Sequence, residues 1–133
     1  MRLWHKDLIP VLPRQQLLSQ WRECCCIARN IAINGTPNHL LVNKVLDYPY
    51  EHFCNYCQIV CIEMESRGYR CDFSRLEQWI PDDYKIVDFE NIFKDWHTDR
   101  YLTQCYYNLQ EKHDCGGISD EEWTKIDKLY NFL

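Results

Sequence analysis

A long amphipathic run near the amino terminus restricts the fold of this chain more than any other feature. The run starts at Pro13, whose missing N–H suits the first position of a helix, and turn residues at 34–38 end it. Between them, one apolar stripe recurs at steps of three and four residues: Leu17, Trp21, Cys24, Ala28 and Ile31. This spacing predicts a helix over residues 13–31 with one buried side. A second stripe of the same helix is mainly basic and contains Arg14, Leu18, Arg22, Cys25 and Arg29.

A second long helix is predicted over about residues 49–67. Pro49 suits its first position, and Gly68 suits the left-handed residue that commonly follows a helix. The stretch 39–46 before it is expected to be a short helix or a loop. The expected buried side chains of the second helix are Phe53, Tyr56 or Cys57, Val60, Ile62 and Met64.

Two further helices are predicted in the last third of the chain. Thr98 is placed to cap a helix that runs to about His113. Ser119 and Glu122 have the spacing of a capping box, which predicts a last helix after the break at 115–117. The expected inward side chains of the Thr98 helix are Leu102, Cys105, Tyr106 and Leu109.

These segments together predict an all-α fold. No segment alternates apolar and polar residues as a strand does, and the weak periodicity of residues 72–97 predicts short helical turns and loops. The chain has 133 residues, of which 46% are hydrophobic, and this is enough for one real core. We therefore expect residues 1–133 to form a compact single-domain bundle of three to five helices with irregular connections.

Charge is distributed unevenly along the chain. The formal net charge is −5, which by itself argues against a nucleic-acid partner. However, residues 1–45 hold six basic and two acidic residues, whereas residues 46–133 hold nine basic and eighteen acidic residues. Such asymmetry is typical of a protein with one face for phosphates and another for solvent. The alternatives are that charge counts over short stretches vary by chance and that the three arginines of the second stripe form an ordinary solvated helix face.

The nine cysteines leave two interpretations open. The amino terminus lacks a signal-peptide pattern and no apolar run is long enough to span a membrane, so we expect reduced thiols in a cytoplasmic protein. Cys54, Cys57 and Cys61 share one face of the second helix, which favours small apolar core positions over a metal site. No metal is therefore expected, and a cysteine-rich metal-binding, redox or interaction protein remains the alternative.

Three parts of the chain form a recognisable combination. The first is the opening Met1–His5 with the following Leu8-Ile9, Leu12-Pro13-Arg14-Gln15-Gln16-Leu17-Leu18, Trp21 and Arg22-Glu23. The others are Arg67-Gly68-Tyr69 and the stretch Tyr101–Lys112. Together they resemble the pyrimidine-dimer DNA glycosylases, the group of phage endonuclease V, and most of all its uncharacterised bacterial relatives. The resemblance covers residues 1–70 and 101–112 and hardly extends to 72–97.

The resemblance implies a compact all-α domain that flips a base out of double-stranded DNA. Enzymes of this family use their amino-terminal α-amine as nucleophile and need no cofactor or metal. A glutamate of the first helix is the catalytic partner, and Glu23 matches it by position. Arg22 matches an arginine that contacts backbone phosphate, and Gln15 matches a polar residue of the same helix.

The chemistry explains why these groups suit damaged or abasic DNA. Schiff-base formation needs a neutral amine, and an α-amine titrates near ~7.7–8.0 against ~10.4 for a lysine. After attack at C1′ of the deoxyribose, Glu23 can stabilise the iminium ion and assist proton removal. His39 and Asn43 lie just beyond the first helix and are candidates for lining the site. The expected phosphate contacts are Arg2, Arg14, Arg22 and Arg29.

The chain departs from the family pattern at both ends. In the phage enzymes the initiator methionine is removed, but here the bulky Arg2 follows Met1 and favours its retention. We therefore expect the α-amine of Met1 to be the nucleophile, with Arg2 replacing the arginine that follows it in the family. The family's aromatic carboxy-terminal segment Trp-Tyr-x-Tyr-Tyr has only a faint counterpart in 129–132. A DNA-binding module of the same fold without catalysis is thus a further alternative.

Overall fold

The computed structural model describes residues 1–133. All of its regular secondary structure is helical, which confirms the predicted fold class. The α-helices are α1 (Arg14–Asn34), α2 (Tyr50–Ser66), α3 (Ser74–Glu77), α4 (Asp99–Asp114) and α5 (Asp120–Phe132). Three short 3-10 helices span Lys6–Val11, Asn43–Asp47 and Phe89–Asn91. None of the helices is long and apolar enough to cross a membrane.

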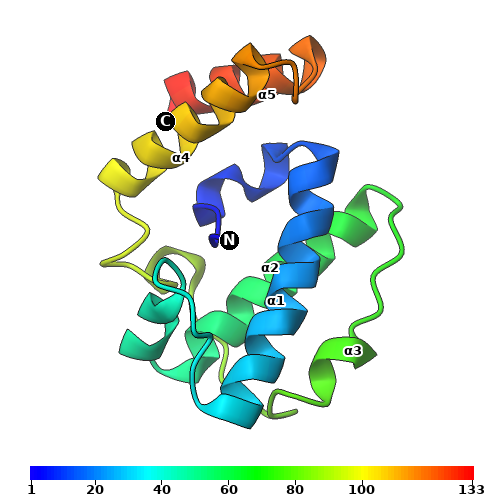
Figure 1. The fold of residues 1–133 in the computed structure, drawn as a ribbon, viewed down its shortest axis with the longest axis vertical. Helices are drawn as coiled ribbons and strands as arrows, with labels where there is room; N and C mark the ends of the chain where they lie inside the picture. Colours follow the sequence, from blue (N-terminus) through cyan, green and yellow to red (C-terminus); the bar gives the residue numbers. More distant parts are fainter.

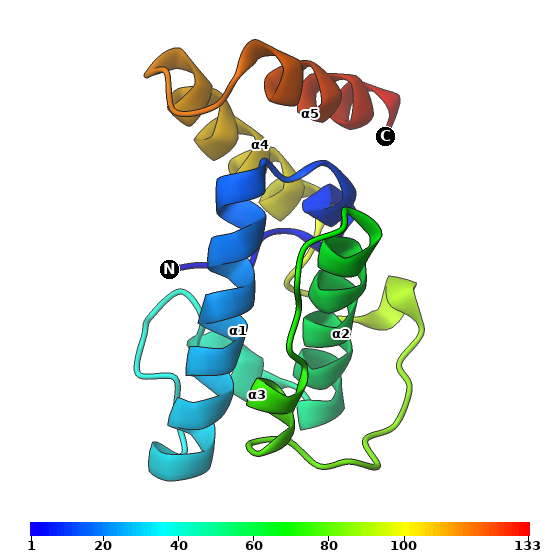
Figure 2. The same ribbon diagram turned by 90° about the vertical axis from the view of Figure 1, so that its right-hand side faces the viewer.

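Two helix pairs make up the molecule (Figures 1 and 2). The long helices α1 and α2 lie side by side and run in opposite directions, while α4 and α5 pack together across one end of this pair. The amino-terminal segment passes between the two pairs, and the chain start lies at the surface beside α1, where Met1 is 43% exposed (Figure 2). A single cluster of 30 buried residues connects all these parts.

The predicted helix boundaries agree with the structure to within a few residues. Pro13 and Pro49 are the caps directly before α1 and α2. Helix α1 continues to Asn34, three residues beyond the predicted end, and the left-handed Gly35 follows it at φ +76°. Gly68 also has a left-handed φ of +79°, as predicted for the residue after α2.

The caps predicted for α4 and α5 are also present. The Thr98 hydroxyl accepts a hydrogen bond from the Tyr101 N–H at the start of α4. Ser119 and Glu122 form the complete capping box at the start of α5. The predicted inward residues of α4 are buried: Leu102, Cys105, Tyr106 and Leu109.

Two details of the prediction were wrong. Ile62 is 58% exposed, because it lies two residues from both Val60 and Met64 and therefore points away from the face that they share. Cys61 occupies the buried position instead. Pro10 and Pro13 predict a short extended entry before α1, but residues Lys6–Val11 form a 3-10 helix that contains Pro10.

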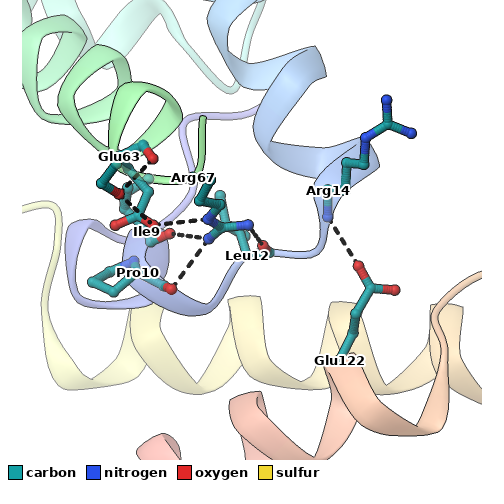
Figure 3. A network of polar contacts seen from close by, with 8 residues as sticks. Ile9, Pro10, Leu12, Arg14, Glu63, Arg67 and Glu122 are labelled. Atoms are coloured by element: carbon teal, nitrogen blue, oxygen red, sulfur yellow. Dashed lines mark hydrogen bonds and ion pairs between the residues drawn. The ribbon is translucent and has the colours of Figure 1, made fainter. Parts of the chain in front are cut away.

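Arg67 fastens this 3-10 helix to the end of α2 (Figure 3). Its guanidinium donates to the carbonyl oxygens of Leu12 at 2.7 Å, Pro10 at 3.1 Å and Ile9 at 3.2 Å. Its Nε also donates to Oε2 of Glu63 at 2.8 Å. A short helix leaves its last carbonyls without partners, and a guanidinium has enough donors to satisfy several of them. Arg67 thereby fixes the course of the chain just before α1.

Candidate active site

A pocket of about 380 Å³ lies where the chain start meets α1 and α4. Four of the predicted site residues line it: Met1, Arg2, Gln15 and Glu23. The other lining residues are Trp4, Gln16, Ser19, Leu41, Asn108 and Lys112. On α1 the contributing positions 15 and 16, 19 and 23 recur at steps of three and four, so they share one face of the helix. The structure therefore brings the chain start and the predicted acid into one cavity.

The fully buried Gln20 links the chain start to Glu23. Its Nε2 donates to the carbonyl oxygen of Arg2 at 3.0 Å and to Oε2 of Glu23 at 3.2 Å. Its Oε1 accepts from the Trp4 N–H at 2.7 Å and from the Tyr56 hydroxyl at 2.9 Å. All four hydrogen-bonding positions of the amide are thus used, which fixes the side chain in one orientation.

Two tyrosines hold the same segment from the other side. The Tyr56 hydroxyl shares its one proton between Oε1 of Gln20 and the carbonyl oxygen of Trp4, which lies 2.6 Å away, and the Tyr101 hydroxyl donates to the carbonyl oxygen of Leu3 at 2.7 Å. Burial of both phenols raises their pKa values, so they remain neutral donors. The backbone of residues 2–4 is therefore held by side chains from α1, α2 and α4.

Burial raises the pKa of the Glu23 carboxyl above its ordinary value. The positive α-amine of Met1 is the largest of the influences that oppose this shift, followed by the backbone amide of Arg2 and by His39 and Arg22. The amine thus lies close enough to act on the carboxylate, yet the two groups make no direct ion pair. Both residues line the same pocket.

A larger pocket of about 940 Å³ adjoins the first one and shares Arg2 and Leu41 with it. Its remaining lining comes from the 40–44 turn, from the residues just before α4 and from the first turns of α4: Leu40, Lys44, Asp95, Trp96, Thr98, Arg100, Tyr101 and Gln104. Together the two pockets are lined by five cationic groups, counting the α-amine, and by two carboxylates. Positive charge is therefore concentrated here in a protein whose formal net charge is −5.

Three other predicted residues lie near the pocket without lining it. Arg22 is exposed at its edge and donates to Oγ of Ser19 at 3.1 Å. His39 acts on the Glu23 charge, and its buried Nδ1 has no hydrogen-bond partner. The Asn43 side chain stabilises the turn at residues 39–43, because its Oδ1 accepts a hydrogen bond from the backbone N–H of His39 at 3.1 Å.

The two remaining arginines of the basic stripe lie apart from Glu23. Arg14 lines a different pocket of about 290 Å³, with its guanidinium 5.7 Å from the ring centre of Tyr69. Arg29 is exposed and lines neither pocket at the chain start. Positions 14 and 29 are about 22 Å apart along a helix that rises 1.5 Å per residue. The stripe therefore extends over most of α1, and only Arg22 borders the candidate site.

Sequence reasoning missed several residues of the site. Gln20 carries a signal that could have been used, since it is a polar residue one turn before Glu23 and faces the buried side of α1. Asn108 and Lys112 belong to the stretch that resembles the family, but no role was assigned to them. Trp96 lies in a segment without periodicity, so no sequence pattern connects it to the chain start.

Fold and site together define an all-α protein with an electropositive cavity at its own amino terminus. A family model described as pyrimidine dimer DNA glycosylase matches residues 1–76, which is more than half of the chain. The chain therefore belongs to this family, and membership implies DNA glycosylase function in the broad sense, with DNA as the substrate. Searches of the curated proteins and of the solved structures gave no match.

The matched region holds the chain start, all of α1 and all of α2. It therefore contains Met1, Gln20 and Glu23. Lys112 and the aromatic wall of the larger pocket, formed by Trp96 and Tyr101, come from residues after the match. The amine and the acid thus belong to the part of the chain that the family model describes, and the remainder completes the cavity around them.

Proposed function

We propose that this protein is a DNA glycosylase and abasic-site lyase with the α-amine of Met1 as nucleophile and Glu23 as its catalytic partner. One observation carries the proposal: the amine and the half-buried carboxylate line the same electropositive pocket. Membership of the pyrimidine dimer DNA glycosylase family supports DNA as the substrate of that pocket.

The reaction begins with the neutral α-amine, which attacks C1′ of the target nucleotide. A new N–C1′ bond forms, the glycosidic bond breaks with its electrons leaving on the base, and opening of the sugar ring leaves an iminium ion. Glu23 then removes a proton from C2′, and β-elimination expels the 3′ phosphate and cuts the strand. The ionised carboxylate also stabilises the positive iminium before elimination.

The environment of Glu23 suits this role. Its raised pKa brings the carboxyl closer to the working pH, so the group can accept a proton and release it again. One amide nitrogen of Gln20 donates to both the Glu23 carboxylate and the carbonyl oxygen of Arg2, which fixes the position of the acid relative to the chain start. Such preorganisation avoids rearrangement when the substrate enters.

Charge and shape account for DNA binding in this proposal. Arg2, Arg22 and Lys112 surround the Glu23 pocket, and each phosphate contact adds salt-dependent affinity without sequence preference. Because C1′ is shielded in a stacked duplex, the target nucleotide must leave the helix. The adjoining larger pocket offers space for it, with Trp96 and Tyr101 as stacking partners.

Other predicted contacts have supporting roles in the proposal. His39 is half-buried near the acid and is a candidate for lining the site when the substrate is bound. Gln15 lines the pocket and provides a neutral polar contact. Arg14 and Arg29 lie on α1 outside both pockets and would contact phosphates only if the duplex followed the length of α1.

Reductive trapping tests the proposal. Borohydride should link the protein covalently to an abasic duplex, and trapping on an ultraviolet-irradiated duplex would extend the activity to base removal. Glu23→Gln should lower strand cleavage by about 10²-fold or more while DNA binding persists. The matched control is Glu121→Gln at an exposed position of α5, which should retain full activity.

The nucleophile is tested separately by blocking the α-amine. An intact-mass measurement establishes whether Met1 is retained, and selective acetylation of the terminus should then abolish trapping. Salt-sensitive DNA binding without any trapping, unchanged by acetylation, would instead identify a non-catalytic DNA-binding module.

A further inference from the structure

Two cysteines meet on the side of α2 where the chain reverses direction. Cys61 lies in α2 and is 3% exposed, whereas Cys71 is half-buried in the segment that follows the helix. The left-handed Gly68 turns the chain, and the Tyr69 N–H donates back to the carbonyl oxygen of Met64 at 2.9 Å. The chain after this turn runs back beside α2 (Figure 2), and Cys71 contacts Cys61.

The two thiols belong to a short chain of hydrogen bonds. The Cys71 thiol donates to Sγ of Cys61 over a sulfur–sulfur distance of 2.6 Å, and the Cys61 thiol donates to Oε1 of Glu65 at 3.2 Å. Glu65 is exposed, so the chain ends at a carboxylate in contact with solvent. A proton released by the inner thiol therefore has an acceptor next to it.

The sulfur–sulfur distance distinguishes between the two usual roles of paired cysteines, which are zinc binding and disulfide formation. Two thiolates on one tetrahedral zinc ion stand about 3.8 Å apart, given zinc–sulfur bonds of about 2.3 Å. The two sulfurs are much closer together than that, and Glu65 is the only further ligand type that clusters with them. The contact is instead a short step from the separation of about 2.05 Å in a disulfide.

We propose that Cys61 and Cys71 form a redox-active dithiol that closes to an intramolecular disulfide by exchange with a small-molecule disulfide of the glutathione type. Cys71 is the attacking residue because it is the more exposed of the two. Neither cysteine lines the two pockets at the chain start, and the proposal rests on none of the activity proposed above.

The exchange takes place in two balanced steps. The Cys71 thiolate attacks one sulfur of the small disulfide, a mixed disulfide forms, and the first small thiolate leaves and takes up a proton. Cys61 then attacks Sγ of Cys71, passes its proton to Glu65, and displaces the second small thiolate, which is protonated in turn. The protein loses two electrons and two protons, and the small disulfide gains both to become two thiols.

Disulfide closure would fasten the 67–73 segment to α2. This segment carries Arg67, which holds the amino-terminal 3-10 helix, and Phe73, whose ring stacks on Trp21 of α1 at 6.1 Å between ring centres. Closing a loop of about ten residues restricts the unfolded chain, so the oxidised protein should have a Tm about 5–10 °C above that of the reduced protein.

The test uses the full-length protein in glutathione buffers of increasing oxidised fraction at pH 8. After alkylation of free thiols and digestion with trypsin, oxidation should link peptide 71–75, whose only cysteine is Cys71, to peptide 45–67. The intact mass should fall by about 2 Da for one disulfide. Cys71→Ser should abolish both changes and the Tm shift, whereas the exposed Cys26→Ser should leave them unchanged.

Three results would overturn the proposal. One is a Cys71 that stays free, or stops at the mixed disulfide, in fully oxidising buffer. Another is a link from peptide 71–75 to peptide 23–29, which holds the cysteines of α1. The third is one equivalent of zinc bound by the reduced protein and lost in Cys71→Ser, which would make the pair a metal site. Cys71→Ser suits all these measurements because its half-buried position tolerates the change better than Cys61 does.

Discussion

Gln20 and Glu23 lie one helical turn apart on α1, and the Gln20 amide nitrogen that donates to the Glu23 carboxylate also donates to the carbonyl of Arg2. A single buried amide thus sets the position of the acid relative to the start of the chain. The two groups come from distant surroundings, since one is inside a long helix and the other is at a free terminus. Without Gln20, no other side chain of α1 would bind the backbone of residues 2–4.

Replacing Gln20 should therefore damage both the fold and the site. Gln20→Leu leaves the Trp4 N–H and the Arg2 carbonyl without partners, and we expect a loss of about 2–4 kcal/mol in the free energy of unfolding. Urea unfolding measures this loss, and trapping on abasic DNA under native conditions measures the effect on the site. The exposed Gln78→Ala provides the control and should change stability by no more than about 0.5 kcal/mol. A Gln20→Leu protein with unchanged trapping would show that the amide has no positioning role.

Glu23 should reduce stability in the pH range where it is ionised. Its pKa is raised in the folded protein because burial penalises the charged form, so the unfolded chain ionises more readily. Folding therefore loses stability as the pH rises through the ordinary glutamate range and above it. Glu23→Gln should raise the free energy of unfolding at pH 7 by less than about 1 kcal/mol, since the group is half-exposed to screening solvent, while it abolishes cleavage. Thermal unfolding at pH 4 and pH 7 measures the difference, which should disappear at the lower pH.

Arg67 should matter more for stability than its position near a helix end suggests. Arg67→Ala removes the donors that satisfy the carbonyls of Ile9, Pro10 and Leu12, and we expect a cost of about 2–3 kcal/mol. The neighbouring Arg70 is exposed and makes no such bonds, so Arg70→Ala is the matched control. Equal effects of the two substitutions in urea unfolding would contradict this role of the guanidinium.

The sequence predicted the helices well because their signals are local. Caps such as Thr98 and Ser119 act on residues three positions away, and a buried stripe repeats every three or four residues. The cavity is different, because it depends on which distant segments meet. The aromatic wall at Trp96 comes from a segment without periodicity, and only tertiary packing brings it beside Arg2.

The predicted site residues also show the difference between what a helix pattern predicts and what tertiary packing decides. Glu23, Gln15 and Met1 were named through the resemblance to the family, and they line one pocket. The arginine stripe was treated as a unit because its members share a face of α1. A shared face does not limit distance along the axis, and Arg14 consequently lies in another pocket beside Tyr69.

Acid should destabilise the protein through His97. Burial lowers the pKa of this imidazole to about 2, with the nearby charges of His5 and Lys6 as smaller causes. The unfolded chain binds a proton near pH 6.5, so this contribution to stability is complete above pH 6.5 and decreases as the pH falls toward 2. Each pH unit in that window costs up to about 1.4 kcal/mol. Urea unfolding at pH 7.5 and 5.5 measures the slope.

A variant assigns this slope to His97. The His97 ring nitrogen Nδ1 accepts the Lys6 N–H at 3.0 Å, and a glutamine side chain can accept in the same way without titrating. His97→Gln should therefore make stability less dependent on pH between 7.5 and 5.5. Equal slopes in the unchanged protein and in His97→Gln would contradict this assignment.

Salt dependence should distinguish the arginines and lysines that contact DNA from those that do not. Lys112 lines the Glu23 pocket from α4, so Lys112→Ala should weaken binding to all duplexes alike and reduce the slope of log K against log salt by about 1. Arg14→Ala removes a cation of the same stripe as Arg22, but its guanidinium lies over Tyr69 in a separate pocket. We expect its slope to stay close to that of the unchanged protein. Fluorescence anisotropy with an abasic duplex at 50–200 mM salt measures both slopes, and a larger effect of Arg14→Ala would place the DNA along the whole of α1 instead of at the chain start.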